Sequence, residues 1–322
     1  MRLPVLLLIL SWAGPSWALP NALAVPEALA QGLQQVHRGR YGQALETSRN
    51  LPASFDGQPL LYLVRAEAYW GLIYCETGHI TSEQVWHVAD KKASAYDNEF
   101  FQAAQQALEA GRHMRQDAAT AAVGALYSGL ARGVRSRLYA LRKQSRKSAS
   151  EAKQMRADLL EAIAKNPQLA PDAYLGLGAY NYYADALSPF LKFIRFFLGI
   201  PGGDRQEGLR QLRIAAAQAS LVATEAQYEL GRIYGIREGR HAEALPWLRK
   251  LSEQYSENGL CALAAGYQAE QAGQKPVAME FIQKAEKAAH EMDGPCRQRL
   301  GAAARGALER LQGEGRSPAA RP

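Results

Sequence analysis

The sequence lacks the short motifs that mark common enzyme active sites. It has no His-Glu-x-x-His pair for zinc and no Gly-x-Ser-x-Gly turn for a nucleophilic serine. Its histidines are scattered, and its three cysteines do not have the close spacing of metal ligands. No segment alternates apolar and polar residues as a half-buried strand does. We therefore expect an all-α protein that is not an enzyme and holds no metal or cofactor.

Long apolar runs are missing beyond the first residues of the chain. Arg2 is followed by a run of about ten mostly apolar residues, shorter than the roughly 20 that span a membrane. Small residues around Ser16-Trp17-Ala18 then offer a cleavage point. This order is typical of a secretory signal peptide cut after Ala18, with an uncleaved anchor as the alternative. We expect an exported protein, periplasmic or secreted, with residues 1–18 as its signal peptide.

Cysteine is scarce, and an exported protein favours its oxidation. Cys261 and Cys296 lie in neighbouring predicted repeats, so they are the expected pair if a disulfide forms. Cys75 lies in an apolar segment and is expected to be a buried thiol.

One short phrase occurs four times, at residues 39–45, 203–209, 239–245 and 273–279. Each copy starts with glycine and has a small residue five positions later, namely Ala44, Gly208, Ala244 and Ala278. The last two copies begin 34 residues apart, at Gly239 and Gly273, which is the period of the tetratricopeptide repeat (TPR). Glycine allows the chain to reverse, and the small residue lets the second helix approach the first. The phrase predicts a right-handed α-solenoid of TPR-like helical hairpins.

The regular spacing does not extend over the whole chain. We expect an N-terminal helical region over residues 19–167, with one TPR-like hairpin and longer, irregular helices. A TPR array with a capping helix should follow over residues 168–312, and residues 313–322 should form a disordered tail. Gly231 precedes Gly239 by eight residues, although the pattern calls for seven. This extra residue predicts a bulge in that helix.

The most distinctive segment of the sequence runs from Tyr174 to Leu212. Asp204, followed by Glu207, predicts a capping box at a helix start. The glycines before Asp204 do not predict a phosphate loop, because no Gly-Lys-Ser or Gly-Lys-Thr follows them. The motif residues of the segment are Tyr180, Asn181, Pro189, Gly202, Gly203, Asp204, Arg205 and Gly208.

This motif is similar to one in uncharacterised exported bacterial tetratricopeptide-repeat proteins. It resembles more faintly the eukaryotic tetratricopeptide 39 and inclusion-body-clearance group, which shares a Gly-Asp-x-x-x-Gly-Leu phrase. The resemblance covers roughly residues 60–289, and its most specific part is the Pro-Gly-Gly-Asp-Arg block. It implies an all-helical binding scaffold in which no catalytic residues are known.

A partner-binding surface can be predicted from the repeats, because the first helix of each pair lines a concave groove. Alignment on Gly178, Gly231 and Gly266 places six side chains near that groove. Tyrosines suit peptide recognition, since they bury a large area at little entropic cost. We expect a protein or peptide partner there, although several of these tyrosines could instead pack between helices. The six residues are Tyr182, Tyr183, Tyr228, Arg232, Tyr267 and Glu270.

The net charge of +7 is concentrated between residues 132 and 156. A solvated helix end and a docking surface both explain such a run. The docking alternative is a peripheral membrane or envelope-surface assembly factor that contacts anionic membrane through this hairpin and an aromatic helix over residues 189–198. Nucleic acid is not expected as a partner of an exported protein. The basic patch comprises Arg132, Arg135, Arg142, Lys143, Arg146 and Lys147.

Overall fold

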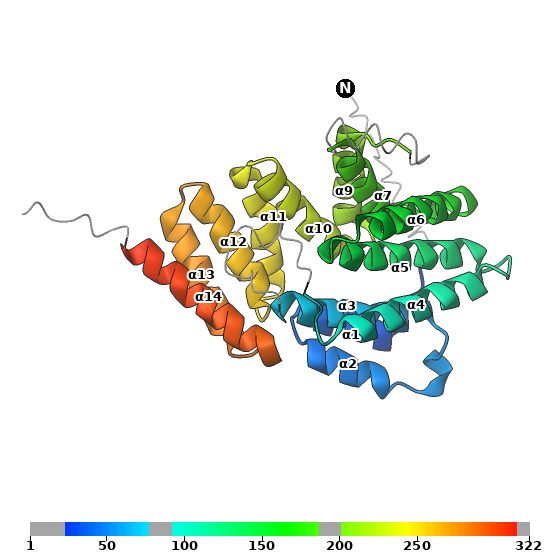
Figure 1. Cartoon of the computed structure of the whole chain (residues 1–322), viewed down its shortest axis with the longest axis horizontal. Coiled ribbons are helices and arrows are strands. Elements are labelled where there is room, and N and C mark those ends of the chain that lie inside the picture. Colours follow the sequence, from blue (N-terminus) through cyan, green and yellow to red (C-terminus); the bar gives the residue numbers. More distant parts are fainter. Residues whose placement is uncertain (1–22, 77–91, 187–200, 314–322) are drawn as a thin grey trace, which may run out of the picture.

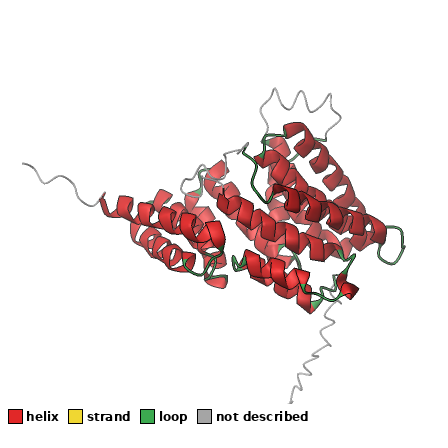
Figure 2. Cartoon of the chain, turned by 60° about the horizontal axis from the view of Figure 1, so that its bottom comes forward, coloured by secondary structure: helices red, strands yellow, loops and turns green. Residues whose placement is uncertain are grey.

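The computed structural model describes residues 23–76, 92–186 and 201–313, and the regular structure in these ranges is helical (Figures 1 and 2). The predicted all-α class is therefore confirmed. The α-helices are α1 (Glu27–His37), α2 (Tyr41–Arg49), α3 (Pro59–Glu76), α4 (Asp97–Met114), α5 (Ala121–Leu141), α6 (Ser145–Lys165), α7 (Ala170–Asp185), α9 (Arg205–Gln218), α10 (Ala223–Arg232), α11 (His241–Gln254), α12 (Gly259–Gln271), α13 (Lys275–Ala289) and α14 (Gly294–Gly313). Short 3-10 turns lie at Ala53–Phe55 and Pro167–Leu169, and a π-helix lies at Ile233–Arg237.

Helices that follow one another in the sequence pack against one another in space, from α1 on α2 to α13 on α14. The four recurring phrases form turns between paired helices, and the small residue of each phrase is buried. Gly39, Gly239 and Gly273 have φ angles of 76°, 64° and 74°, a conformation that favours glycine. Gly203 has a different role, because a Cβ atom there would collide with the carbonyl oxygen of Asn181 on α7.

The extra residue between Gly231 and Gly239 is accommodated by the π-helix, in which each turn holds more residues than in an α-helix. The predicted bulge is confirmed. Gly231 itself lies against α11, where an added Cβ atom would come within 2.7 Å of Leu248 Cγ. The close approach of α10 and α11 therefore depends on glycine at this position.

Two further local predictions concern helix ends. Helix α6 ends at Lys165, before the turn at Pro167, and this turn falls at the predicted boundary between the two helical regions. Asp204 caps α9 by accepting hydrogen bonds from the backbone N–H groups of Gln206 and Glu207, at 2.9 and 3.0 Å. The second half of the predicted capping box differs, because the Glu207 carboxylate accepts hydrogen bonds from Arg210 instead.

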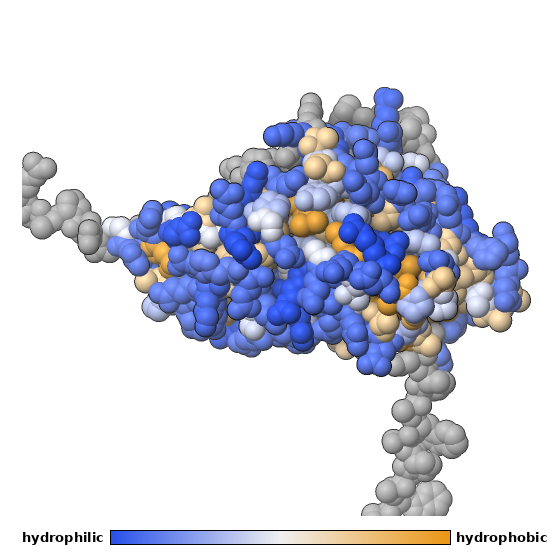
Figure 3. Space-filling model, turned by 90° about the horizontal axis from the view of Figure 1, so that it is seen from below, coloured by the Kyte–Doolittle hydropathy of each residue, from blue (hydrophilic) through white to orange (hydrophobic). Residues whose placement is uncertain are grey.

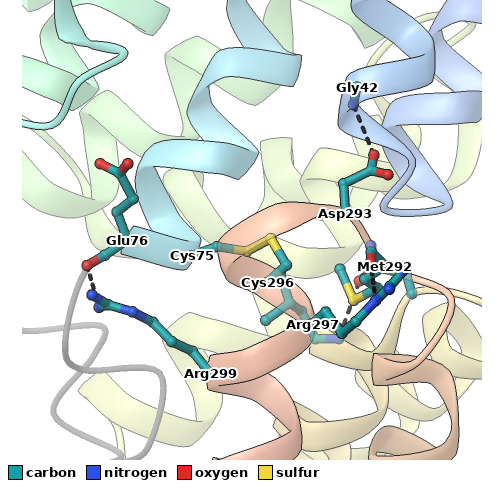
Figure 4. Close-up of a disulfide and its surroundings, with 10 residues drawn as sticks. Gly42, Cys75, Glu76, Met292, Asp293, Cys296, Arg297 and Arg299 are labelled. Atoms are coloured by element: carbon teal, nitrogen blue, oxygen red, sulfur yellow. Dashed lines mark hydrogen bonds between the residues drawn. A yellow bond between two sulfur atoms is a disulfide. The ribbon is translucent and has the colours of Figure 1, made fainter.

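The disulfide expected between Cys261 and Cys296 is wrong. Cys75, at the end of α3, is bonded to Cys296, at the start of α14, and Cys261 is a buried free thiol (Figure 4). The physical reason is that α14 packs back against α3, which brings together residues 221 positions apart. Both bonded cysteines are fully buried. The disulfide therefore ties α14, the last helix in the described ranges, to the N-terminal part of the chain.

Polar contacts reinforce this junction between the N-terminal hairpin, α1 and α2, and the C-terminal helices. The Asp293 carboxylate accepts a hydrogen bond of 2.8 Å from the backbone N–H of Gly42, as Figure 4 shows. The Asn258 side-chain amide donates to the carbonyl oxygen of His37 at 2.9 Å. The Arg40 guanidinium lies 3.4 Å from the Glu257 carboxylate. The N-terminal hairpin is thus held by residues from the last third of the chain.

The surface is largely polar, and the face in Figure 3 shows only scattered apolar residues. In the described ranges, Leu160 is the one large apolar side chain that is exposed, at 41%. No helix within these ranges has both the length and the apolar character of a membrane span. The predicted signal peptide, Pro189 with the aromatic helix, and nearly all of the predicted tail lie outside the described residues.

Candidate functional site

Helix α10 gathers three of the six predicted groove residues around a shared hydrogen-bond network. Arg232 follows Tyr228 by four residues and Glu229 by three, so its side chain neighbours both on the helix surface. The Tyr183 hydroxyl, from α7, donates to Glu229 Oε1 at 2.7 Å and accepts from Arg232 Nη2 at 2.7 Å. Arg232 also donates to Glu229 through Nε and Nη2, both at 3.0 Å. The arrangement holds the Tyr183 hydroxyl between the Glu229 carboxylate and the Arg232 guanidinium.

The residues that lie next to this hydrogen-bond network come from the N-terminal region, on α3 and α5. Glu67, Trp70 and Tyr74 of α3 follow one another at spacings of three and four, and Tyr74 is hydrogen-bonded to Tyr228. Arg137, from α5, donates to both Glu67 carboxylate oxygens at 2.7 and 2.8 Å. Its guanidinium lies 4.2 Å from the centre of the Trp70 ring, in a cation–π contact.

We call these eight residues the inner-face cluster. Each of them is half-buried, so each keeps some contact with solvent although helices from both halves of the chain surround it. Tyrosine hydroxyls, an indole and paired charges offer donors, acceptors and aromatic surface together, which suits a peptide better than an apolar ligand. The members are Glu67, Trp70, Tyr74, Arg137, Tyr183, Tyr228, Glu229 and Arg232.

The charges of the Glu229–Arg232 pair are stable over the physiological pH range. Burial alone would raise the pKa of Glu229, but the Arg232 guanidinium outweighs it and holds the pKa below its ordinary value of 4.5. Burial would lower the pKa of Arg232, and Glu229 reverses this shift, so the pKa is raised. Burial raises the pKa of Tyr228, which keeps its hydroxyl protonated. The Glu229–Arg232 pair therefore stays charged, and Tyr228 stays neutral.

A second ion pair lies beside the cluster and joins α1 to α10. His37 Nε2 is 2.7 Å from Glu225 Oε1, and His37 Nδ1 is 3.4 Å from the Tyr255 hydroxyl. Burial would lower the pKa of His37, but the Glu225 carboxylate raises it above the ordinary value of 6.5. Burial likewise opposes ionisation of Glu225, and His37 offsets it, so the Glu225 pKa is lowered. The pair depends on pH and closes the N-terminal hairpin onto α10.

The other three predicted groove residues lie elsewhere. Tyr182 is only 2% exposed and packs in the core between α7, α9 and α10, where burial raises its pKa to about 12. Tyr267 is 7% exposed, and it lies behind the cluster near Tyr74. Glu270 pairs with Arg310 of α14 at 2.9 Å. For Tyr182 and Tyr267 the structure has the alternative arrangement, in which tyrosines pack between helices.

The sequence prediction lacks five of the eight residues of the inner-face cluster, including Glu229, which directly follows the predicted Tyr228 on α10. Glu67, Trp70, Tyr74 and Arg137 belong to helices outside the regular array, and the repeat alignment does not extend to them. The spacing of the three α3 residues was a usable signal for a shared face. Their meeting with α10 is a tertiary contact that the local pattern does not contain.

The motif residues hold the α7–α9 hairpin together. The Tyr180 hydroxyl donates to the carbonyl oxygen of Pro201 at 2.8 Å, and the Asn181 side chain donates to Gln211 at 2.9 Å. Gly208 packs so close to α7 that a Cβ atom would lie 2.6 Å from the backbone nitrogen of Tyr182. Arg205 pairs with Glu238 at 2.7 Å, while Gly202 is exposed at the start of the turn. These contacts give the segment a structural role.

The predicted basic patch is divided into a buried and an exposed part. Arg132 lies 2.7 Å from Asp158 and 3.2 Å from Glu151, and Arg135 lies 2.9 Å from Glu151. Arg142 is buried and pairs with Asp97 of α4 at 2.6 Å. These three arginines satisfy acidic partners inside the protein. The residues that stay exposed at the turn between α5 and α6 are Lys143, Arg146 and Lys147.

Comparisons with known proteins do not assign the chain to a family. No family model matches it, and no curated protein matches it significantly. Within the described residues, no group of three or more histidine, cysteine, aspartate or glutamate side chains is arranged to hold a metal ion. The description of the site therefore depends on its geometry, which defines a polar and aromatic surface between two helical regions.

Proposed function

We propose that this chain is a non-enzymatic scaffold of the cell envelope that binds a protein or peptide segment at the inner-face cluster. In this proposal the helices form a right-handed α-solenoid of TPR-like hairpins, and the cluster lies on its concave side. The observation that carries the proposal is the half-buried set of tyrosines, Trp70 and paired charges between α3 and α10. The buried Cys75–Cys296 disulfide agrees with an exported protein, because such bonds persist in oxidising compartments.

The cluster suits an extended peptide for two reasons. The Tyr183 and Tyr228 hydroxyls and the Trp70 ring can contact backbone amides and side chains at low entropic cost. In addition, Glu225 Oε2, beside the cluster, and Arg137 Nε are buried atoms that have no hydrogen-bond partner within the described ranges. A peptide backbone supplies both an N–H donor and a carbonyl acceptor, so it matches one unpaired acceptor and one unpaired donor. Because both atoms are buried, we infer that α3 and α10 move apart when the peptide binds.

Site-specific photo-crosslinking in the native compartment tests the proposal. A photoreactive phenylalanine analogue at Tyr228 should trap a protein partner, which mass spectrometry then identifies. The matched control carries the same analogue at Glu253, an exposed position on α11 away from the cluster. Equal capture at both positions, or capture at Glu253 alone, would contradict binding at the cluster.

A second candidate function is peripheral contact with an anionic membrane. Arg146, Lys153 and Leu160 follow one another at seven-residue spacing on α6, which places two cations and the exposed leucine on one face. Such a stripe can lie at a lipid surface. Sedimentation with anionic vesicles at low and high salt tests it, since electrostatic binding weakens as salt screens the charges. Absence of binding at low salt would remove this candidate.

A further inference from the structure

A small cavity lies between α2, α3 and α4, and the inner-face cluster contributes none of its lining residues. Its volume is about 160 Å³, which is below the 300–1,000 Å³ of pockets for drug-sized ligands. Such a space holds one small chemical group. Its lining residues are Leu45, Arg49, Arg65, Tyr69, Glu99, Gln102, Ala103 and Gln106.

The two arginines of this cavity have no acidic partner in the described part of the chain. Arg49 and Arg65 have no carboxylate within ion-pair distance among the described residues, whereas arginines such as Arg132, Arg142 and Arg232 each have one. The guanidinium group stays charged, and its donors match the geometry of carboxylate and phosphate groups. With two arginines and one glutamate in its lining, the cavity has a net positive charge.

Arg65 is held in place by other parts of the protein. Its Nε donates to Ser48 Oγ at 3.2 Å, and its Nη2 donates to the Ser48 carbonyl oxygen at 2.7 Å. The guanidinium also lies 5.7 Å from the centre of the Tyr62 ring. These contacts leave Nη1 without a bonded partner in the described part of the chain, and they remove the entropy that a free arginine would lose on binding.

The second arginine and the opposite wall complete the arrangement. Arg49 Nη2 donates to the Tyr69 hydroxyl at 3.3 Å, and its other N–H groups have no hydrogen-bond partner among the described residues. On α4, Gln102 and Gln106 are spaced by four residues and so share a face, where each amide offers further N–H donors. Glu99 is the one acidic residue of the lining, at the exposed end of that face.

We propose that this cavity binds a small oxyanion, a carboxylate or a phosphate group, between Arg49 and Arg65. Guanidinium groups match such anions because their N–H donors pair with two oxygens at once. The glutamine amides add donors from α4. Glu99 weakens the interaction through like-charge repulsion and confines the anion to the arginine side of the cavity.

Titration calorimetry and NMR with two probes, sodium acetate and inorganic phosphate, test this proposal on the full chain at low ionic strength. The tighter of the two probes should bind saturably to the wild-type protein, and its identity distinguishes a carboxylate from a phosphate ligand. Arg49→Gln should weaken binding roughly 10- to 100-fold, as expected for loss of hydrogen bonds to a charged group. Arg65→Gln should have the same effect, and circular dichroism checks that it folds, since Arg65 also holds Ser48.

Two further variants make the outcome decisive. Glu99→Gln should strengthen binding about two- to fivefold, because it removes a repulsive charge near the surface. Arg112→Gln removes an exposed arginine of α4 outside the cavity, and it should leave binding unchanged. The proposal is overturned if neither probe binds saturably, or if Arg112→Gln weakens binding as much as Arg49→Gln.

Discussion

Removal of the Cys75–Cys296 disulfide should destabilise the protein strongly. The bond joins residues 221 positions apart, so it restricts the unfolded chain over most of the described sequence. The loop-closure relation gives an entropy change of about 18 cal/mol/K for this loop, or about 5 kcal/mol at 25 °C. This is an upper value, because the unfolded chain retains some structure that the relation ignores.

The double variant Cys75→Ala/Cys296→Ala should therefore unfold at a lower denaturant concentration than the wild type under non-reducing conditions. The buried position of both residues favours alanine over serine, which would bury two unpaired hydroxyls. Cys261→Ala is the matched control, since it removes a buried free thiol and keeps the bond. Its unfolding midpoint should lie close to that of the wild type.

Thiol titration of the unfolded protein provides an independent check. The wild type, unfolded without reductant, should show a single reactive thiol, that of Cys261. A measured count of three thiols, or a loss of less than about 1 kcal/mol in the double variant, would refute the reasoning, because removal of a native disulfide typically costs about 2–5 kcal/mol.

Three further predictions concern ion pairs and a helix cap. Removal of the buried Arg132 in Arg132→Met should cost about 3 kcal/mol in urea unfolding, because Asp158 loses one of its two arginine partners, whereas Arg146→Met, on the surface, should cost almost nothing. The His37–Glu225 pair requires a protonated histidine and an ionised glutamate. Its contribution should be present between about pH 4.5 and 6.5, and it should be lost as pH rises through the raised His37 pKa or falls through the lowered Glu225 pKa. The melting temperature of His37→Gln should thus lie further below that of the wild type at about pH 5.5 than at about pH 9; the opposite order would contradict the pair. Asp204→Ala should cost about 1 kcal/mol by removing the cap of α9, measurable by thermal unfolding, and Asp204→Asn should restore most of it.

Local features of the fold could be predicted from the sequence because short-range physics determines them. The turn at Gly239 needs a positive φ angle, the helix before Pro167 must end, and Asp204 can cap the next helix within its own turn. The extra residue after Gly231 likewise has one compact solution, a π-helix. Each of these features depends on residues only a few positions apart.

The candidate site could be predicted only in part, because it depends on contacts across the whole chain. Alignment of the repeats found Tyr183, Tyr228 and Arg232, but it could not find Arg137 or the α3 residues that meet them. The same reason explains the wrong disulfide. Neighbouring repeats made Cys261 the nearest partner of Cys296, and the return of α14 to α3 has no short-range signal.

The link between α3 and α14 also affects how the protein unfolds. In a linear array each repeat contacts only its neighbours, so terminal units fray first and shortening from either end costs little beyond the removed unit. Here the last helix is covalently joined to the third, and Asp293 binds the N-terminal hairpin. Loss of α14 would uncover the apolar flank of a helix more than two hundred residues away. Opening at one terminus should therefore loosen the other, and truncation from the C-terminal end should yield an aggregating chain instead of a shorter stable one.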